Sequence, residues 1–227
     1  MAQTPYAYIF GYGSLIETQS RASTVASALY AQPALVKGVQ RGWFDRVMDT
    51  TNYSCTFLGA VATSPNILCN GVIYPVSKQD FDAYVARESG YKPTEIKPDA
   101  LIMLDGTTKL DPAPTNGIWY FANTERHVAD KSFPIVQTYV DVCLTGCLQL
   151  EATYPLARRI ADFQNLSFSE VFIASTIEWS TYWENDRLIP RRPFVYQPKA
   201  YAIDQLLNKA PNTKDIYPKI PLAPGRW

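Results

Sequence analysis

The chain has 227 residues, which is enough to bury a full hydrophobic core in one large domain or in a domain with an extension. Apolar residues make up 47% and charged residues 19%, as in ordinary globular proteins and unlike disordered ones. The 21 basic and 21 acidic residues cancel, which argues against a nucleic acid or a membrane surface as partner. No apolar run approaches the roughly 18 residues of a membrane span, and the first ten residues lack the basic region of a signal or transit peptide.

The cysteine pattern argues against a metal centre. The chain has four cysteines, none in a CxxC pair, and a single histidine, His127, which is too few to complete a zinc site. Cys143 and Cys147 stand four residues apart on an expected helix, where buried thiols pack as small apolar groups. We therefore expect no bound metal and a protein of the reducing cytosol.

The first half of the chain is rich in expected strands. Alternating or continuous apolar residues predict strands at 6–10, 34–44, 55–62, 71–76, 94–104 and 117–122. One helix interrupts them at 77–88, where Ser77 is a suitable N-cap and Asp80 stands three residues further on.

The second half is mainly helical. An apolar stripe after Pro134 predicts a long helix, and two more helices are expected at 155–163 and 168–183. Ser167 and Glu170 fit a capping box at the start of the second of these. Seven of the 17 prolines fall from residue 190 onward, around one short helix at 198–209. Strands followed by helices predict an α+β fold, with a strongly curved or closed sheet and helices at its side.

A glycine-rich turn, FGYGSLIE at residues 10–17, lies between the first strand and a helix. It is not a dinucleotide fingerprint, because Ile16 stands where GxGxxG requires glycine, and it lacks the Gly-Lys-Ser/Thr ending of a Walker loop. One interpretation is purely structural, in that the glycines relieve backbone strain. The other is that Gly11 and Gly13 let a ligand approach the backbone, whose N–H groups suit a carboxylate.

A second candidate is Glu88, at the end of the expected helix 77–88. It lies seven residues after Phe81 and four after Tyr84, on the same face as the apolar residues Phe81, Tyr84 and Val85. A buried carboxylate would have a pKa raised from about 4.3 toward neutrality, where a general acid–base works best. The alternative is that Glu88 stands at a frayed helix end and reaches water.

The combination of FGYGSLI with ARESGY at residues 86–91 resembles the γ-glutamylcyclotransferase superfamily, most closely its ChaC-like branch. There a GYGSLIW loop is followed by a REGGY-type segment that carries the catalytic glutamate. The segments at 36–44 and 134–146 also resemble that family, and the likeness spans about residues 6–165. Glu17 stands in place of the usual tryptophan, which weakens the case for glutathione as substrate. The resemblance implies a catalytic domain at 1–165, with a mixed, curved or closed barrel and flanking helices, and a C-terminal extension at 166–227 packed on it.

Members of that family release 5-oxoproline from a γ-glutamyl compound by attack of the substrate's own α-amine, without a cofactor. The resemblance implies that Glu88 moves the proton. The implied substrate-binding groups are the turn and a tyrosine of the later helix, namely Tyr12, Gly13, Ser14, Leu15 and Tyr139. An ordinary core position is an equally good interpretation of Tyr139. The expected partner is a small γ-glutamyl molecule; the leaving amine and the oligomeric state stay open.

Two other functions remain open at this stage. One is a binding module of the same fold without turnover. The other is a cysteine-dependent hydrolase that pairs a thiol with His127. Ser14 is a poor candidate nucleophile, because no GxSxG elbow and no partner histidine accompany it.

Further polar and aromatic residues have two interpretations each. Arg41 and Arg46 would neutralise a second substrate carboxylate, or they are solvated arginines at a sheet edge. An aromatic and acidic cluster near the end of the helix expected at 168–183 suggests a sugar platform with paired acids. Simple packing under the proline-rich tail explains the same residues, which are Glu178, Trp179, Tyr182, Trp183 and Glu184.

Overall fold

The computed structural model describes residues 4–25, 28–48, 54–87, 90–188, 190 and 199–223. Six strands form the larger sheet in the order β6-β8-β1-β5-β2-β7. Their bounds are Ala7–Gly11 for β1, Gln32–Lys37 for β2, Leu68–Val76 for β5, Tyr91–Ile96 for β6, Leu101–Met103 for β7 and Ile118–Asn123 for β8. Strand β1 lies at its centre, antiparallel to β5 and parallel to β8.

The second sheet has four strands in the order β10-β9-β4-β3. They are β3 (Val39–Val47), β4 (Cys55–Ala62), β9 (Ile135–Val136) and β10 (Trp183–Glu184). Within the described residues the strand pairing gives two sheets and does not close them into one ring. The expected α+β fold is confirmed, while closure into a barrel stays a prediction.

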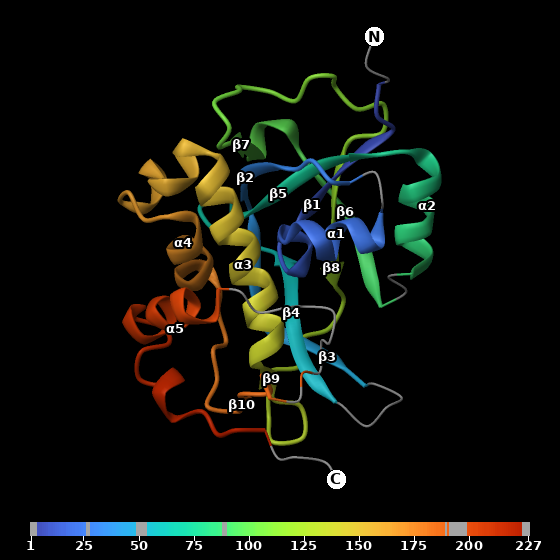
Figure 1. Cartoon of the computed structure of the whole chain (residues 1–227). Coiled ribbons are helices and arrows are strands. Elements are labelled where there is room, and N and C mark those ends of the chain that lie inside the picture. The colour runs from blue at the N-terminus through green and yellow to red at the C-terminus, as the bar shows by residue number, and fades with distance from the viewer. Residues whose placement is uncertain are drawn as a thin grey trace.

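Five α-helices flank the sheets among the described residues: α1 (Thr18–Thr24), α2 (Lys78–Arg87), α3 (Gln137–Thr153), α4 (Phe168–Ser175) and α5 (Ala200–Lys209). Short 3-10 turns occupy Ser14–Ile16, Pro98–Ala100, Pro155–Arg158, Ala161–Phe163 and Tyr217–Lys219. Figure 1 shows α3 between the strands and the pair α4 and α5, with α2 at the far side of the molecule. No helix in the described part of the chain is long and apolar enough to cross a membrane.

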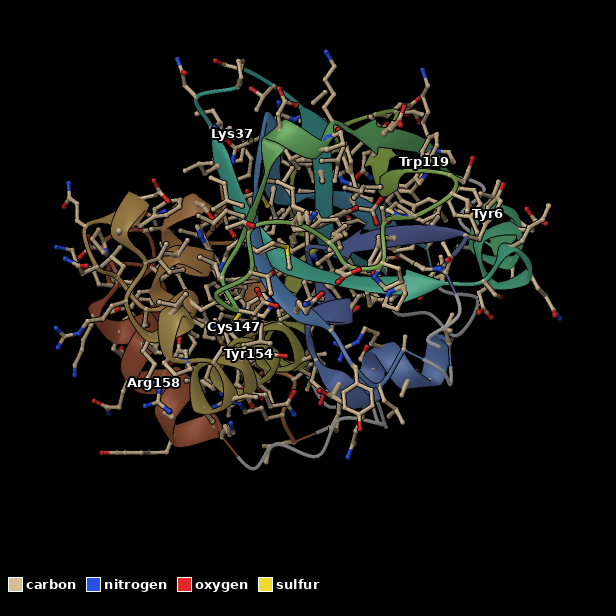
Figure 2. The ribbon with its side chains drawn as sticks, turned by 90° about the horizontal axis from the view of Figure 1, so that it is seen from above. Tyr6, Lys37, Trp119, Cys147, Tyr154 and Arg158 are labelled. Atoms are coloured by element: carbon tan, nitrogen blue, oxygen red, sulfur yellow. The ribbon has the colours of Figure 1, made fainter. Side chains whose placement is uncertain are left out.

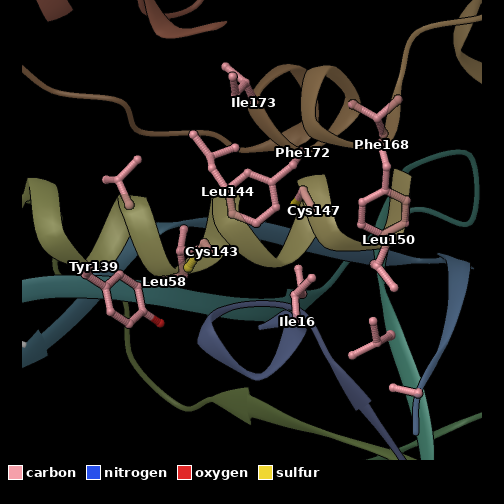
Figure 3. Close-up of a cluster of buried hydrophobic side chains, with 14 of the residues drawn as sticks. Ile16, Leu58, Tyr139, Cys143, Leu144, Cys147, Leu150, Phe168, Phe172 and Ile173 are labelled. Carbon is pink, nitrogen blue, oxygen red and sulfur yellow. The ribbon is translucent and has the colours of Figure 1, made fainter. Parts of the chain in front are cut away.

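Helix α3 is the centre of the larger core. Twelve of its residues are buried, including both of its cysteines, because β-strands cover one side of the helix and α4 covers the other. Figure 3 shows Phe168, Phe172 and Ile173 of α4 packed on α3 from one side and Ile16 from the other. The opposite end of the molecule is closed by α2, where Phe81 packs edge-on against Tyr6 and Trp119. Figure 2 shows Tyr6 and Trp119 at that end and Cys147 on the helical side.

Four expected elements differ from the structure. The strand expected at 94–104 is β6 and β7, with the 3-10 turn Pro98–Ala100 between them. The strand expected at 34–44 is two strands, since Gly38 adopts a φ of 78° that ends β2 and starts β3. The segment 155–163 forms 3-10 turns, and the helix expected at 168–183 ends at Ser175. It ends there because Ile177 pairs with β3, accepting from the N–H of Trp43 and donating to the carbonyl of Arg41.

Candidate functional site

Two buried arginines hold the carbonyl groups of the glycine turn. Arg41 donates from Nη1 to the carbonyl of Tyr12 at 3.1 Å. Arg21 donates from Nη1 to the carbonyls of Leu15 at 2.9 Å and Ile16 at 3.0 Å. The side chain of Arg41 is fully buried and that of Arg21 nearly so. Both positive charges therefore lie directly behind the turn.

The carbonyls of Gly13 and Ser14 accept hydrogen bonds from within the turn, whereas some of its N–H groups have no acceptor among the described residues. The N–H of Ile16 bonds to the carbonyl of Gly13, and the N–H of Glu17 bonds to that of Ser14. For the N–H groups of Gly13, Ser14 and Leu15, the described residues provide no acceptor. A backbone segment with its carbonyls occupied and three donors unused suits a bound anion.

Helix α3 fixes the position of this turn. A Cβ on Gly146 would stand 2.5 Å from the backbone nitrogen of Glu17 and 2.6 Å from the carbonyl carbon of Ile16, so only glycine allows this approach. Glu17 is itself held by two hydrogen bonds, accepting from the N–H of Ser20 and from the side chain of Gln149 of α3. Glu17, which replaces the tryptophan of the ChaC-like pattern, is thus the N-cap of α1.

Tyr139, near the start of α3, lies beside the turn. Its ring stacks on Phe57 with centroids 4.3 Å apart and meets Trp43 edge-on at 5.9 Å. A Cβ on Gly13 would stand 3.0 Å from the Tyr139 hydroxyl. In Figure 3 this hydroxyl points from α3 toward the side where Ile16 lies. The structure therefore brings together the turn and the tyrosine that the sequence had suggested from different parts of the chain.

The start of α3 is capped by the C-terminal part of the chain. Asp186 accepts hydrogen bonds from the N–H of Thr138 at 2.8 Å and from its hydroxyl at 2.6 Å. A carboxylate at this position satisfies a free N–H group and complements the helix dipole. The neighbouring Tyr139 is positioned by this cap.

A polar cluster that the sequence analysis missed lies next to the turn and Tyr139. It consists of Asp45, Tyr91 and Asn123, and we call it the seam cluster. One carboxylate oxygen of Asp45 accepts from the Tyr91 hydroxyl, and the other accepts from Asn123 Nδ2 at 2.8 Å. Asn123 Oδ1 in turn accepts from the N–H of Ala60 at 2.9 Å. Asp45 and Ala60 belong to the smaller sheet and Tyr91 and Asn123 to the larger one, so the cluster joins the two sheets.

The seam cluster adjoins the glycine turn. Asp45 pairs in register with Phe57, on which Tyr139 stacks, and Tyr139 lies against Gly13. On the other side, the Tyr12 hydroxyl donates to the carbonyl of Phe121 at 2.8 Å, two residues before Asn123.

A bulge in β3 makes this cluster possible. The register of β3 against β4 shifts between Trp43 and Asp45, which re-aims the side chain of Asp45. A Cβ on Gly59 would overlap the side chain of Asn123, so glycine there leaves room for it. Neither the bulge nor the role of Gly59 can be recognised from the pattern of apolar residues in the sequence.

Burial dominates the electrostatics of the cluster. It raises the pKa of Asp45 above its usual range, although the hydrogen bonds from Tyr91 and Asn123 act in the other direction. The pKa of Tyr91 is raised far more, first by burial and then by the nearby Tyr12, Asp45 and Tyr139. The Tyr91 hydroxyl therefore keeps its proton and donates it to Asp45 at any ordinary pH.

The predicted catalytic residue, Glu88, lies outside the described residues, so its orientation stays a prediction. The helix before it is described to Arg87. Phe81 and Tyr84 are buried as expected, but Val85 is 40% exposed, so the apolar face of α2 is narrower than predicted.

Arg41 is neither a solvated arginine at a sheet edge nor a cation that is available to a substrate carboxylate. Besides Tyr12, it donates to Asn70, to the carbonyl of Phe172 and to the hydroxyls of Ser175 and Thr176. All of its donor nitrogens are engaged by protein groups, so its role is to fix the turn.

Arg46 also has partners within the protein. It donates to the carbonyl of Val128 and forms an ion pair with Asp130 at 2.6 Å. Its position at the sheet edge agrees with the simpler of the two interpretations.

The cysteines and the histidine are not brought together as a catalytic pair. All four cysteines are free and buried, and burial raises the pKa of Cys69 and Cys147. A raised pKa disfavours the nucleophilic thiolate. His127 is exposed and bonds to Glu125 at 2.8 Å. These observations argue against the cysteine-hydrolase alternative.

The aromatic cluster of the C-terminal part is packing rather than a sugar platform. Trp183 is buried and stacks on Trp179 with centroids 5.2 Å apart, while Trp179 also contacts Trp43 at 5.2 Å. Glu178 pairs with Arg126 on the surface.

Among the described residues, no group of three or more histidine, cysteine, aspartate or glutamate side chains is placed to hold a metal ion. A recess of about 400 Å³ lies between Lys37, Thr94, Lys97 and Tyr120, and its lining includes none of the predicted site residues.

Comparisons with known proteins add a fold-level result. No family model and no curated protein matches the sequence. Among solved structures, a γ-glutamyl cyclotransferase matches with a TM-score of 0.51 and 16% identity, covering 64% of this chain and 80% of that one. An uncharacterized protein from Homo sapiens matches with a TM-score of 0.50 and 14% identity, covering 76% of this chain and 90% of that one. Across most of its length, this chain therefore has the mixed α+β fold of the γ-glutamyl cyclotransferase structures.

Proposed function

We propose that this protein is a γ-glutamylcyclotransferase, which releases 5-oxoproline from a γ-glutamyl amino acid, peptide or amine. The observation that carries the proposal is the glycine turn, whose carbonyls from Tyr12 to Ile16 all accept hydrogen bonds, while three consecutive N–H groups have no acceptor among the described residues. Its location beside Tyr139 and the fold of the cyclotransferase structures support the same conclusion.

The turn would bind the glutamyl end of the substrate. The N–H groups of Gly13, Ser14 and Leu15 face an α-carboxylate, and the charges of Arg41 and Arg21 behind them favour an anion. The same groups can stabilise the oxyanion that develops on the γ-carbonyl during attack. The hydroxyl of Ser14 would serve as a hydrogen-bond donor and not as a nucleophile.

The chemical step needs no external nucleophile. The substrate's α-nitrogen attacks its own γ-carbonyl carbon, a bond forms between them, and the bond from that carbon to the leaving nitrogen breaks. Because the reaction is intramolecular, folding the substrate into the attacking geometry supplies much of the acceleration. The α-nitrogen gives up two protons in total and the leaving nitrogen gains both.

Glu88 would carry these protons as general base and then general acid. A glutamate suits both roles when its pKa is raised toward the working pH. Tyr91, a member of the seam cluster beside the turn, follows Glu88 by three residues, and this closeness in sequence supports the assignment of proton transfer to Glu88.

The proposal assigns the remaining parts as follows. Residues 1–165 form the catalytic domain, residues 166–227 pack on it, and the sheets together make the curved, barrel-like support of the site. The partner is a small molecule of the cytosol, with no nucleic acid and no membrane.

The test is detection of 5-oxoproline by mass spectrometry from a panel of γ-glutamyl compounds, glutathione included. The native protein should form product from at least one compound, and Glu88→Gln should reduce the rate by about 10²-fold or more, as loss of a general acid–base does. Glu125→Gln, the same change at an exposed position beside His127, should retain the native rate. Binding of γ-glutamyl compounds without any 5-oxoproline would favour a non-catalytic binding module of the same fold.

A further inference from the structure

The seam cluster contains a charge that its structural role does not require. Asp45 bridges two sheets through hydrogen bonds from Tyr91 and Asn123. A neutral asparagine or glutamine could make such a bridge. Within the described residues, no lysine or arginine forms an ion pair with Asp45. A partly buried carboxylate without a cation is unfavourable unless something positive binds to it.

The hydrogen bonds of the cluster also determine what can bind. Tyr91 donates its only hydroxyl proton to Asp45, so its oxygen can act toward a ligand only as an acceptor. The Tyr12 hydroxyl donates its proton to the carbonyl of Phe121. On this side of the site the groups therefore favour a ligand that donates hydrogen bonds, whereas the glycine turn on the other side favours a ligand that accepts them.

Acceptors on one side of the site and donors on the other match the ammonium and the carboxylate group of an amino acid. In a γ-glutamyl compound the α-carboxylate and the α-ammonium are attached to the same carbon atom, so their binding groups must be close neighbours. Tyr139 provides this closeness, because it contacts both Gly13 of the turn and Phe57, the register partner of Asp45.

We propose that Asp45 is a positioning residue for the substrate's α-ammonium group: it orients the Tyr91 hydroxyl oxygen toward the ammonium and supplies the negative charge behind it. This inference rests on the proposed function for the identity of the substrate. It assigns recognition of the α-amine to the seam cluster, and it leaves proton transfer to Glu88.

The test compares two probes that differ only in the α-amine. These are γ-glutamylmethylamide, the smallest secondary γ-glutamyl amide, and the monomethylamide of glutaric acid, which lacks the amine. Dissociation constants are measured by calorimetry on the full chain carrying Glu88→Gln, so that neither probe is consumed. We expect the amine-bearing probe to bind about 10-fold tighter or more, the range of a charge-assisted hydrogen bond.

Three single variants and one double variant in the same background test which residues cause this preference for the amine-bearing probe. Asp45→Asn should reduce the ratio of the two dissociation constants to near 1, and Tyr91→Phe should reduce it in the same direction. The double variant should lose no more than the larger single loss, because Asp45 acts through Tyr91. Asp82→Asn removes one charge from an exposed position on α2 and should leave the ratio unchanged. Thermal unfolding of each variant verifies that it is folded, and Tyr91→Phe serves if Asp45→Asn does not fold.

The outcomes separate the two proposals. An unchanged ratio in folded Asp45→Asn, together with 5-oxoproline formation by the native protein, overturns the role of Asp45 and leaves the cyclotransferase standing. A ratio that falls in Asp45→Asn, with no 5-oxoproline from the native protein, leaves the ammonium site standing and overturns the enzyme. If neither probe binds, the ammonium site fails, and 5-oxoproline formation by the native protein alone decides the cyclotransferase.

Discussion

Arg41 donates a hydrogen bond of 3.1 Å to the carbonyl oxygen of Tyr12, across 29 residues of sequence, and so ties β3 to the glycine turn. Arg41 is fully buried, and its guanidinium also lies over the ring of Phe172 with its central carbon 3.8 Å from the centroid. Because the carbonyl side of the turn faces this cation, the N–H side is left for a ligand. Together with Arg21, which holds the carbonyls of Leu15 and Ile16, Arg41 thereby sets the polarity of the candidate site.

The first prediction concerns Arg41→Lys. An ammonium cannot reach the several acceptors that the planar guanidinium reaches, so buried acceptors lose their donors. We expect the free energy of unfolding to fall by about 2–4 kcal/mol, measured by urea denaturation. Arg46→Lys, at the sheet edge, should cost less than about 1 kcal/mol. Equal losses for the two variants would contradict the role assigned to Arg41.

The second prediction concerns the contact between the turn and α3. In Gly13→Ala, the added methyl would stand 3.0 Å from the Tyr139 hydroxyl, closer than ordinary contact, so the tyrosine or the turn must shift. We expect KM for a γ-glutamyl substrate to rise by about 10-fold and stability to fall by about 1–2 kcal/mol.

The control for Gly13→Ala uses the same contact. In a Tyr139→Phe background the hydroxyl is gone, so the stability cost of Gly13→Ala should shrink by about 1 kcal/mol. Gly90→Ala, whose methyl would meet no atom of the described residues within 4 Å, should cost little stability. Strictly additive losses in Gly13→Ala and Tyr139→Phe would rule out the contact as the cause.

Local sequence signals predicted the local elements well. The strand expected at 55–62 has these bounds in the structure, and the capping box of Ser167 and Glu170 is present. Ser77 and Asp80 exchange the expected hydrogen bonds at the start of α2. These features depend on residues a few positions apart, and so short-range pattern and propensity are sufficient to reveal them.

The missed features depend on distant partners. Asp45 finds Tyr91 and Asn123, which follow it by 46 and 78 residues, only because a bulge after Trp43 turns it toward the other sheet. The burial of Arg41 depends on acceptors from β5 and α4. No periodicity within one element encodes such contacts. The sequence therefore pointed to the turn and to Tyr139, whose roles in the site stay predictions, but it gave no signal for the seam cluster.

The third prediction is the pH dependence of Asp45→Asn. Burial raises the pKa of Asp45 above its unfolded value of about 3.9. Between these two pKa values the folded state holds a proton that the unfolded state has lost, so the contribution of Asp45 to stability decreases as pH rises through this interval. The groups facing the carboxylate, Tyr91 from β6 and Asn123 from β8, keep their protonation state over this range.

Asparagine cannot ionise. The free energy of unfolding of Asp45→Asn, relative to that of the native protein, should therefore rise from pH 4 upward and then level off. Urea denaturation of both proteins at pH steps from 4 to 8 measures this difference in the free energy of unfolding. All other titratable groups are the same in both proteins, so their contributions cancel. A difference that is constant over the whole range, or that changes in the opposite direction, would refute the raised pKa. A gain in stability combined with a loss of preference for the α-amine would indicate that the charge is retained for binding.

The fourth prediction concerns the link between α3 and the C-terminal part of the chain. Asp141 of α3 is fully buried and receives two hydrogen bonds of 2.7 Å from the guanidinium of Arg187. Arg187 also pairs with Asp204 of α5 at 2.8 Å, and Tyr217 donates to the same carboxylate. Arg187 follows Asp186, whose carboxylate caps α3 beside Tyr139.

Arg187→Met should lower the free energy of unfolding by about 3–5 kcal/mol, because it leaves the Asp141 carboxylate buried without a cation. Arg187→Met combined with Asp141→Leu should recover much of this loss, since an apolar pair can replace a buried ion pair at little cost. Lys78→Met, which breaks the exposed pair with Asp82, should cost less than about 1 kcal/mol. If the double variant regains stability but KM for a γ-glutamyl substrate stays raised, the C-terminal part acts on the site through the start of α3. If KM returns to the native value with stability, its effect is on folding alone.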